Sequence, residues 1–194
     1  MPAKRPAYRL KDITDAQMTP PQRALRDAIF AGPRGKRSKL NGPFAVWLHA
    51  PEFGHLAQAL GAHCRFKTAL PTRLSEFAIL TTAHLWRAQY EWYAHAPMAE
   101  RAGVKPRTIS DLKAGRAPKS APKDERALYD FIKELYRTRR VSDRAYARVH
   151  ALLGDAAMVE FVGVLGYYVL ISMTLNVFRA QVPQEAPLPF RERA

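Results

Sequence analysis

The chain has 194 residues, of which 47% are hydrophobic and 25% charged, proportions typical of one globular domain and not of a disordered chain. Its single cysteine, Cys64, excludes an intramolecular disulfide, a Cys-x-x-Cys redox pair and a thiolate metal cluster. The formal net charge of +14 favours anionic ligands but carries no information about the fold.

Apolar residues recur at helical spacing along most of the chain, and strand-like alternation is scarce. Residues 1–18 are expected to form an extended arm, and Thr19 can cap a helix that starts at Pro20. After a loop over 32–41 and a short turn at Pro43, glycine and proline signals divide the remaining sequence into helices. The predicted helices cover about 20–31, 51–67, 72–86, 89–102, 106–114, 124–139, 142–153 and 159–178.

These elements predict an all-α protein of seven or eight helices. Residues 1–38 would form an arm, a short helix and a basic loop, residues 39–182 the helical domain, and residues 183–194 a proline-rich extended tail. The N-terminus lacks the apolar segment of a secretory signal. The apolar C-terminal helix is short for a membrane span and is interrupted by polar residues, so a core or subunit-interface helix is the better interpretation. We therefore expect a soluble, cytoplasmic protein without a membrane segment.

Basic residues cluster over 4–11, 34–39 and 101–126. None of these clusters has the aromatic interleaving of a single-strand binding surface, and no zinc-finger or RNA-recognition signature is present. No nucleic-acid partner is expected, although a basic nucleic-acid or membrane-surface protein remains an alternative.

Glu91 and His95 are four residues apart in a predicted helix, so they share one face, which continues into apolar Met98. A buried carboxylate needs a partner, and His95 is the nearest one. Pro97 removes a backbone hydrogen bond inside this helix and is expected to kink it. The alternative interpretation is an exposed ion pair beside a tolerated bend.

Glu76 also heads an apolar stripe, one helix earlier, although a position in the first helical turn would explain a carboxylate there equally well. In the most buried-looking helix, Tyr167, Tyr168 and Asn176 carry polar atoms that need hydrogen-bond partners or line a pocket. His84 is interpreted as a core histidine.

The sequence offers little for a metal or a cofactor, and neither is expected. His49, His55 and His63 do not have the spacing of ligands on one helix. No Gly-rich phosphate loop or nucleophile elbow is present.

Four segments resemble the carboxymuconolactone decarboxylase-like superfamily, which includes the AhpD alkylhydroperoxidases. They are NGPFAVWLHAPEFGHLAQALG, LPTRLSEFAIL, YEWYAHAPMAERAGV and GYYVLISMTLNVF, and the resemblance spans about residues 40–182. It implies an AhpD-like helical bundle and a homo-oligomer.

The redox branch of that family has a glutamate followed twelve residues later by Cys-x-His-Cys-x-x-x-His. Counted from Glu76, Ala88 and Glu91 stand at the two cysteines, Tyr90 stands at the intervening histidine, and His95 is the final histidine. Because both cysteines are absent, this chain lacks the thiols of a dithiol peroxidase cycle.

The resemblance implies that Glu76, Glu91 and His95 converge in one pocket as catalytic residues. Two carboxylates would raise the pKa of the histidine and favour imidazolium as a proton donor. Decarboxylation of a carboxylated lactone, or a related lyase or isomerase step on a small anion, needs such a donor. The residues expected to contact the substrate are Tyr90, Tyr168 and Asn176.

A second class remains open, in which the protein is a non-catalytic AhpD-like oligomer that binds a small apolar or aromatic ligand. In either class we expect self-association into a dimer or a trimer of dimers, because the C-terminal helix is apolar nearly all round.

Overall fold

The computed structural model describes residues 5–35 and 39–191, and within them it contains helices and no β-strand. The all-α class predicted from the sequence is confirmed. A short 3-10 helix, η1 (Asp15–Gln17), lies within the arm that was predicted to be extended. The α-helices that follow are α1 (Pro20–Ala31), α2 (Pro43–Trp47), α3 (Pro51–Phe66), α4 (Thr72–Leu85), α5 (Gln89–Arg101), α6 (Pro106–Lys113), α7 (Lys123–Thr138) and α8 (Asp143–Phe178).

The helix boundaries follow local signals in the sequence. Before α1, the backbone N–H of Thr19 donates to Oε1 of Gln22 at 2.8 Å, one half of a capping box. Ser142 precedes α8, and its hydroxyl accepts a hydrogen bond from a backbone N–H three residues further on. Gly103 and Gly115 follow α5 and α6 with φ of +99° and +72°, a region that glycine adopts without steric cost.

Two helices predicted near the C-terminus form one kinked element, α8. Gly154 lies inside it with φ 70° and ψ 178°, so a single non-helical residue separates the two arms. A residue with a Cβ would be strained at this φ, and glycine is therefore suited to the kink.

On length and composition alone, α8 could also cross a membrane. Half of its most apolar 18-residue window is buried inside the fold. A helix at the core of a domain passes the same test, so this property carries little weight by itself.

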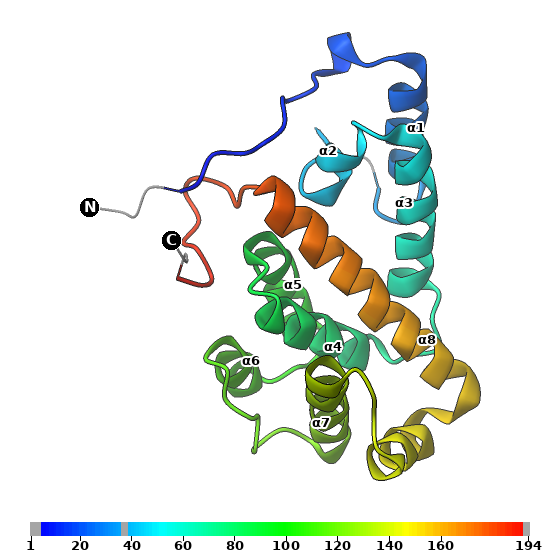
Figure 1. The fold of residues 1–194 in the computed structure, drawn as a ribbon, viewed down its shortest axis with the longest axis vertical. Coiled ribbons are helices and arrows are strands. Elements are labelled where there is room, and N and C mark those ends of the chain that lie inside the picture. Colours follow the sequence, from blue (N-terminus) through cyan, green and yellow to red (C-terminus); the bar gives the residue numbers. More distant parts are fainter. Residues whose placement is uncertain (1–4, 36–38, 192–194) are drawn as a thin grey trace.

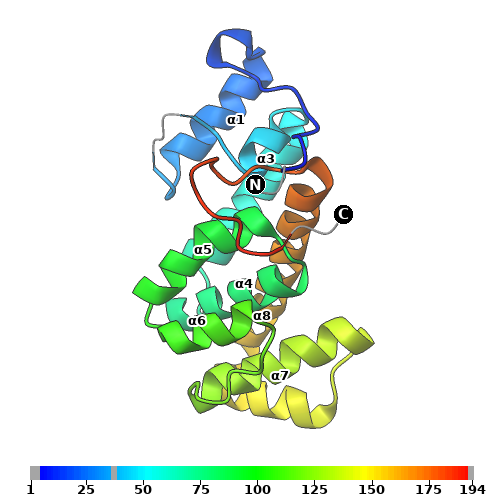
Figure 2. The same ribbon diagram turned by 90° about the vertical axis from the view of Figure 1, so that its left-hand side faces the viewer.

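The long helix α8 runs diagonally through the molecule and contacts α2, α3, α4, α5 and α7 (Figure 1). Helix α3 lies on one side of α8 with α1 packed against it, and the adjacent pair α4 and α5 lies on the other side. Seen from the side, α7 lies at the end of the molecule opposite α1 (Figure 2). The pair α4–α5, closed over by α8, holds the candidate site.

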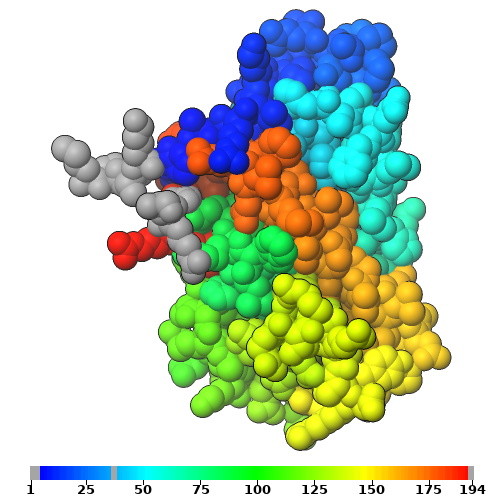
Figure 3. Space-filling view, viewed as in Figure 1, coloured from blue at the N-terminus to red at the C-terminus, as the bar shows by residue number. Residues whose placement is uncertain are grey.

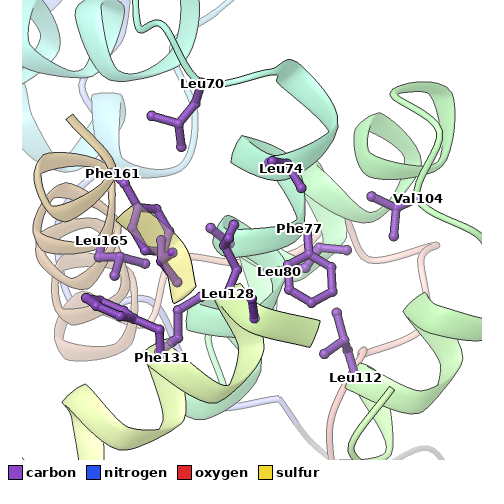
Figure 4. Packing of buried hydrophobic residues seen from close by; sticks show 14 of the residues in the cluster. Leu70, Leu74, Phe77, Leu80, Val104, Leu112, Leu128, Phe131, Phe161 and Leu165 are labelled. Atoms are coloured by element: carbon purple, nitrogen blue, oxygen red, sulfur yellow. The ribbon is translucent and has the colours of Figure 1, made fainter. Parts of the chain in front are cut away.

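Helix α4 is at the centre of the larger hydrophobic cluster, where its side chains meet those of α7 and α8 (Figure 4). Phe77 and Leu80 of α4 are fully buried, as is Phe161 of α8, which packs on the ring of Phe131 at 5.4 Å between centroids. Every residue of α4 from 74 to 83 is buried. A charged residue in this stretch therefore needs a partner inside the protein.

Both ends of the described chain pack against the domain. The backbone N–H of Arg9 donates to the carbonyl of Phe178 at 3.1 Å, which ties the arm to the end of α8 (Figure 3). In the tail, Phe190 is 5% exposed and its ring lies 5.3 Å from that of Trp92. Parts of the predicted arm, basic loop and tail lie outside the described residues, namely 1–4, 36–38 and 192–194.

Candidate active site

Three buried ionisable side chains meet where α4 packs on α5. Glu76 projects from the middle of α4, and Glu91 and His95 lie one turn apart on α5. They are 5%, 3% and 6% exposed. Burial of charged groups costs several kcal/mol unless they are paired, so their mutual geometry decides whether the cluster is stable.

The imidazole of His95 lies between the two carboxylates. Its Nδ1 is 2.7 Å from Oε2 of Glu76, a hydrogen-bond distance, and its Nε2 is 3.1 Å from Oε1 of Glu91. The second contact has the length of an ion pair but not the angles of a hydrogen bond, so Oε1 of Glu91 has no hydrogen-bond partner among the described residues. Glu76 therefore orients the ring, while Glu91 supplies mainly charge.

The two carboxylates determine the protonation of His95. Burial by itself lowers the pKa of the imidazole, but the charges of Glu76 and Glu91 outweigh burial and raise the pKa from 6.5 to about 9. At neutral pH the ring is therefore an imidazolium with a proton on each nitrogen. Such a ring can donate a proton and cannot accept one.

One expectation about these helices needs correction. Helix α4 starts at Thr72, so Glu76 is not in its first turn, and the helix dipole does not explain a carboxylate there. Helix α5 continues through Pro97, which lies inside it. The missing N–H of a proline is tolerated here because Pro97 is exposed and the carbonyl it leaves free can reach solvent.

Two tyrosines of α8, Tyr167 and Tyr168, lie close to this cluster. The ring of Tyr168 meets the ring of His95 edge to face, with centroids 5.3 Å apart. Tyr167 passes so close to Gly61 of α3 that an added Cβ would lie 1.9 Å from its hydroxyl oxygen. Burial, the largest cause, raises the pKa of both phenols well above 10, so both hydroxyls stay protonated.

A small cavity, called here the inner cavity, opens beside His95. Its volume is about 70 Å³, below the range of about 300–1,000 Å³ typical of sites for drug-sized ligands. It admits a few waters or a group of a few heavy atoms. The residues that line it are Arg34, Asn41, Pro43, Phe44, Arg65, Tyr90, Glu91, Ala94, His95, Met98, Tyr167, Tyr168 and Ile171.

Two arginines of the inner cavity were not anticipated from the sequence. Arg34 follows α1, and its guanidinium lies 5.0 Å from the centre of the Phe44 ring. Arg65 belongs to α3 and donates to the sulfur of Met98. The imidazolium and the two carboxylates have a combined net charge of −1. The two positively charged arginines lie beside this cluster, at the same cavity. Nothing local in the sequence marks them, because the packing of α1 and α3 beside α5 brings them in.

The residues predicted to contact substrate separate into two places. Tyr90 and Tyr168 line the inner cavity. Asn176 does not, and its side-chain amide donates to the carbonyl of Trp86 at 2.8 Å in a different cavity. Asn176 follows Tyr168 by two helical turns, about 12 Å along the axis, which explains the separation.

The remaining reactive side chain, Cys64, is buried on α3. Burial, chiefly, raises the pKa of its thiol, whereas a peroxidatic cysteine needs an accessible thiolate. In the described part of the chain, no group of three or more histidine, cysteine, aspartate or glutamate side chains is arranged to hold a metal ion.

The fold and this cluster define an all-helical protein with a buried Glu–His–Glu site and no cysteine pair. Residues 51–134 match the model of the Carboxymuconolactone decarboxylase family, and that segment contains Glu76, Glu91 and His95. The resemblance to the carboxymuconolactone decarboxylase/AhpD-like family is thereby confirmed.

The fold is similar to that of a solved structure described as an alkylhydroperoxidase AhpD core, an uncharacterized peroxidase-related protein from Ralstonia eutropha JMP134. The TM-score is 0.75 with 16% sequence identity, over 94% of this chain and 95% of that chain. At this identity the likeness concerns the fold alone. No curated protein sequence matches the chain significantly.

Proposed function

We propose that this protein catalyses an acid–base step on a small carboxylated anion: decarboxylation of a carboxylated lactone, or a related lyase or isomerase step. The observation that carries the proposal is the His95 ring, held between two carboxylates at the wall of the inner cavity. With a pKa of about 9, His95 is a loaded proton donor at neutral pH.

In the decarboxylation, the bond between the ring carbon and the carboxylate breaks and carbon dioxide leaves. The electron pair stays on the substrate as an enolate spread onto the lactone carbonyl. His95 then delivers its Nε2 proton to the carbon, and Glu76 keeps the ring oriented through Nδ1. Glu91 stabilises the imidazolium before transfer, and bulk solvent restores the proton.

Arg34 and Arg65 suit the enolate oxygen better than the departing carboxylate. An arginine bonded to the carboxylate would stabilise the ground state and slow the loss of carbon dioxide. An arginine at the carbonyl oxygen gains strength as negative charge develops there. Tyr167 and Tyr168 also line this cavity, and each keeps a protonated hydroxyl that can serve as a donor to that oxygen.

The second candidate is a protein that binds a small ligand without turnover. The small volume of the inner cavity favours it, because a whole carboxylated lactone does not fit in about 70 Å³ without movement of the lining. In this case the Glu76–His95–Glu91 cluster would hold α4 to α5.

The test uses a carboxylated muconolactone in heavy water and follows carbon dioxide release and deuterium at the product carbon. We expect turnover by the natural protein and its loss in His95→Gln. The control is His63→Gln, since His63 is exposed on α3 and pairs with Glu160 at 3.0 Å. Binding without turnover by the natural protein supports the second candidate, and unchanged turnover in His95→Gln refutes His95 as the donor.

A further inference from the structure

A second, larger cavity is lined by Tyr90 but not by His95. This outer cavity has a volume of about 440 Å³ and forms where the N-terminal arm, the end of α4, the end of α8 and the C-terminal tail meet. Tyr90 lines both cavities. Its ring is held against Gly42, where an added Cβ would lie 2.4 Å from a ring carbon. The two cavities are therefore neighbours with a fixed side chain between them.

Four arginines from four separate segments line the outer cavity: Arg5, Arg87, Arg179 and Arg191. No aspartate or glutamate is among the described residues that line it. Like charges around one cavity repel each other, and a bound anion relieves that repulsion. In contrast, Arg73 and Arg148, elsewhere in the molecule, each pair with a carboxylate.

The hydrogen bonds of Arg87, Arg179 and Arg191 leave donors available. Arg5 uses both terminal nitrogens on four backbone carbonyls of the tail, at 2.9 Å to those of Val182 and Pro183, which fixes its position and leaves its charge without a carboxylate partner. Arg87 donates through one nitrogen to the carbonyl of Arg191 at 2.8 Å. The side chains of Arg179 and Arg191 have no hydrogen bond within the described part of the chain.

A simpler explanation covers part of this pattern. Arg179 caps α8 and Arg87 follows α4, and cations are favourable at the C-terminal end of a helix. However, Arg5 and Arg191 lie in non-helical segments, where no helix dipole attracts them. The helix dipole therefore does not account for the four charges.

The apolar part of the wall narrows the class of ligand. Trp86 lines the cavity and is 37% exposed, and Leu85, Leu175 and Leu188 line it as well. A flat or apolar group can pack there while its anionic groups reach the arginines. The volume lies within the range of about 300–1,000 Å³ typical of small-molecule sites.

We propose that the outer cavity binds a small organic anion with two or more carboxylate or phosphate groups on a flat or apolar body. Arg87, Arg179 and Arg191 hold the anionic groups through their guanidinium N–H donors, Arg5 adds positive charge, and Trp86 contacts the body. The site is distinct from the His95 cluster and does not depend on the chemistry proposed there.

Calorimetric titration tests this site with two probes, benzene-1,3,5-tricarboxylate and inorganic pyrophosphate. The test variant is Arg179→Gln/Arg191→Gln, because both side chains are exposed and make no hydrogen bond that the fold needs. The matched control is Arg137→Gln/Arg144→Gln, which removes the same charge from α7 and the start of α8, near the opposite end of the molecule (Figure 1). Circular dichroism verifies that both variants are folded.

We expect saturable binding of the tricarboxylate at one site per chain. The affinity should fall at least tenfold in the test variant and less than twofold in the control, with pyrophosphate binding more weakly because it lacks an apolar body. Equal losses of affinity in both variants would show that binding depends only on the overall positive charge of the chain, and this would overturn the proposal. Absence of tricarboxylate binding would also overturn the proposal. So would a loss of affinity in Arg65→Gln equal to that in the test variant, because it would place the ligand in the inner cavity.

Discussion

The Nδ1 atom of His95 lies 2.7 Å from Oε2 of Glu76, although the two residues are 19 positions apart. This contact joins α4 to α5 in a region where every neighbouring residue of α4 is buried. It fixes the orientation of the ring and leaves the Nε2–H for the second carboxylate and the inner cavity. One hydrogen bond thus links the packing of the two helices to the chemistry of the site.

Glu76→Gln removes the charge and keeps the shape and one acceptor oxygen. We expect turnover to fall by about 10²–10⁴-fold, because the proton donor loses its orienting carboxylate. The free energy of unfolding should also fall, by about 2 kcal/mol, since a buried ion pair loses one partner while Glu91 remains. Steady-state kinetics and urea unfolding measure the two effects.

The control is Glu100→Gln, on the exposed side of α5. It should leave turnover and stability unchanged. A loss of stability in Glu76→Gln with full turnover would assign the cluster a structural role only.

Stability should depend on pH through His95. Its pKa is raised from 6.5 to about 9 on folding, so its contribution is complete below pH 6.5 and is lost as the pH rises through 9. We expect the free energy of unfolding to decline over this interval by on the order of 3 kcal/mol. In His95→Gln this part of the decline should be absent, and an identical pH profile in the variant would contradict the assignment.

The fold and the cluster could be predicted from the sequence because their signals are local. Thr19, Ser142, Gly103 and Gly115 mark helix ends through cap chemistry that depends on a few adjacent residues. The pairing of Glu91 with His95 follows from helical periodicity, and the addition of Glu76 follows from the spacing of the family motif.

The surroundings of the cluster could not be predicted, because they depend on tertiary packing. Arg34 and Arg65 reach the inner cavity only through the placement of α1 and α3. Asn176 was assigned to the site from its polar side chain on an apolar helix, but the rise of that helix carries it to the outer cavity. Helical periodicity predicts which face of a helix a residue occupies. Which cavity that face lines at a given point along the axis depends on the elements that pack against it there.

Cysteine-dependent peroxidase activity should be absent. Ala88 and Glu91 occupy the positions of the two cysteines, and Cys64 is buried with its pKa raised chiefly by desolvation. With hydroperoxide and a dithiol reductant, we expect no turnover above background in the natural protein or in Cys64→Ser. Robust turnover by the natural protein that is lost in Cys64→Ser would contradict this prediction, because Cys64 is the single cysteine of the chain.

The chain should self-associate through α3 and α8. These contacting helices expose a set of large apolar side chains that includes Leu56, 75% exposed, and Val159, 73% exposed, together with Phe53, Leu60 and Val162. Apolar surface of this kind on neighbouring helices usually packs against a symmetric partner. Sedimentation at micromolar concentration should give a multiple of 21.9 kDa, and Leu56→Lys should reduce it. A clean monomer of the natural protein would refute this.

The proposed chemistry depends on the protonation of His95, and heteronuclear NMR of its ring nitrogens measures that protonation most directly. Ring signals are assigned with His95→Gln and followed from pH 5 to pH 10, a range chosen to bracket the ordinary pKa of histidine, about 6.5. We expect both nitrogens to carry protons at neutral pH and the midpoint of the titration to lie near 9. A midpoint at or below 6.5 would contradict the proposal. The ring would then be mostly neutral at pH 7 and could not be the proton donor.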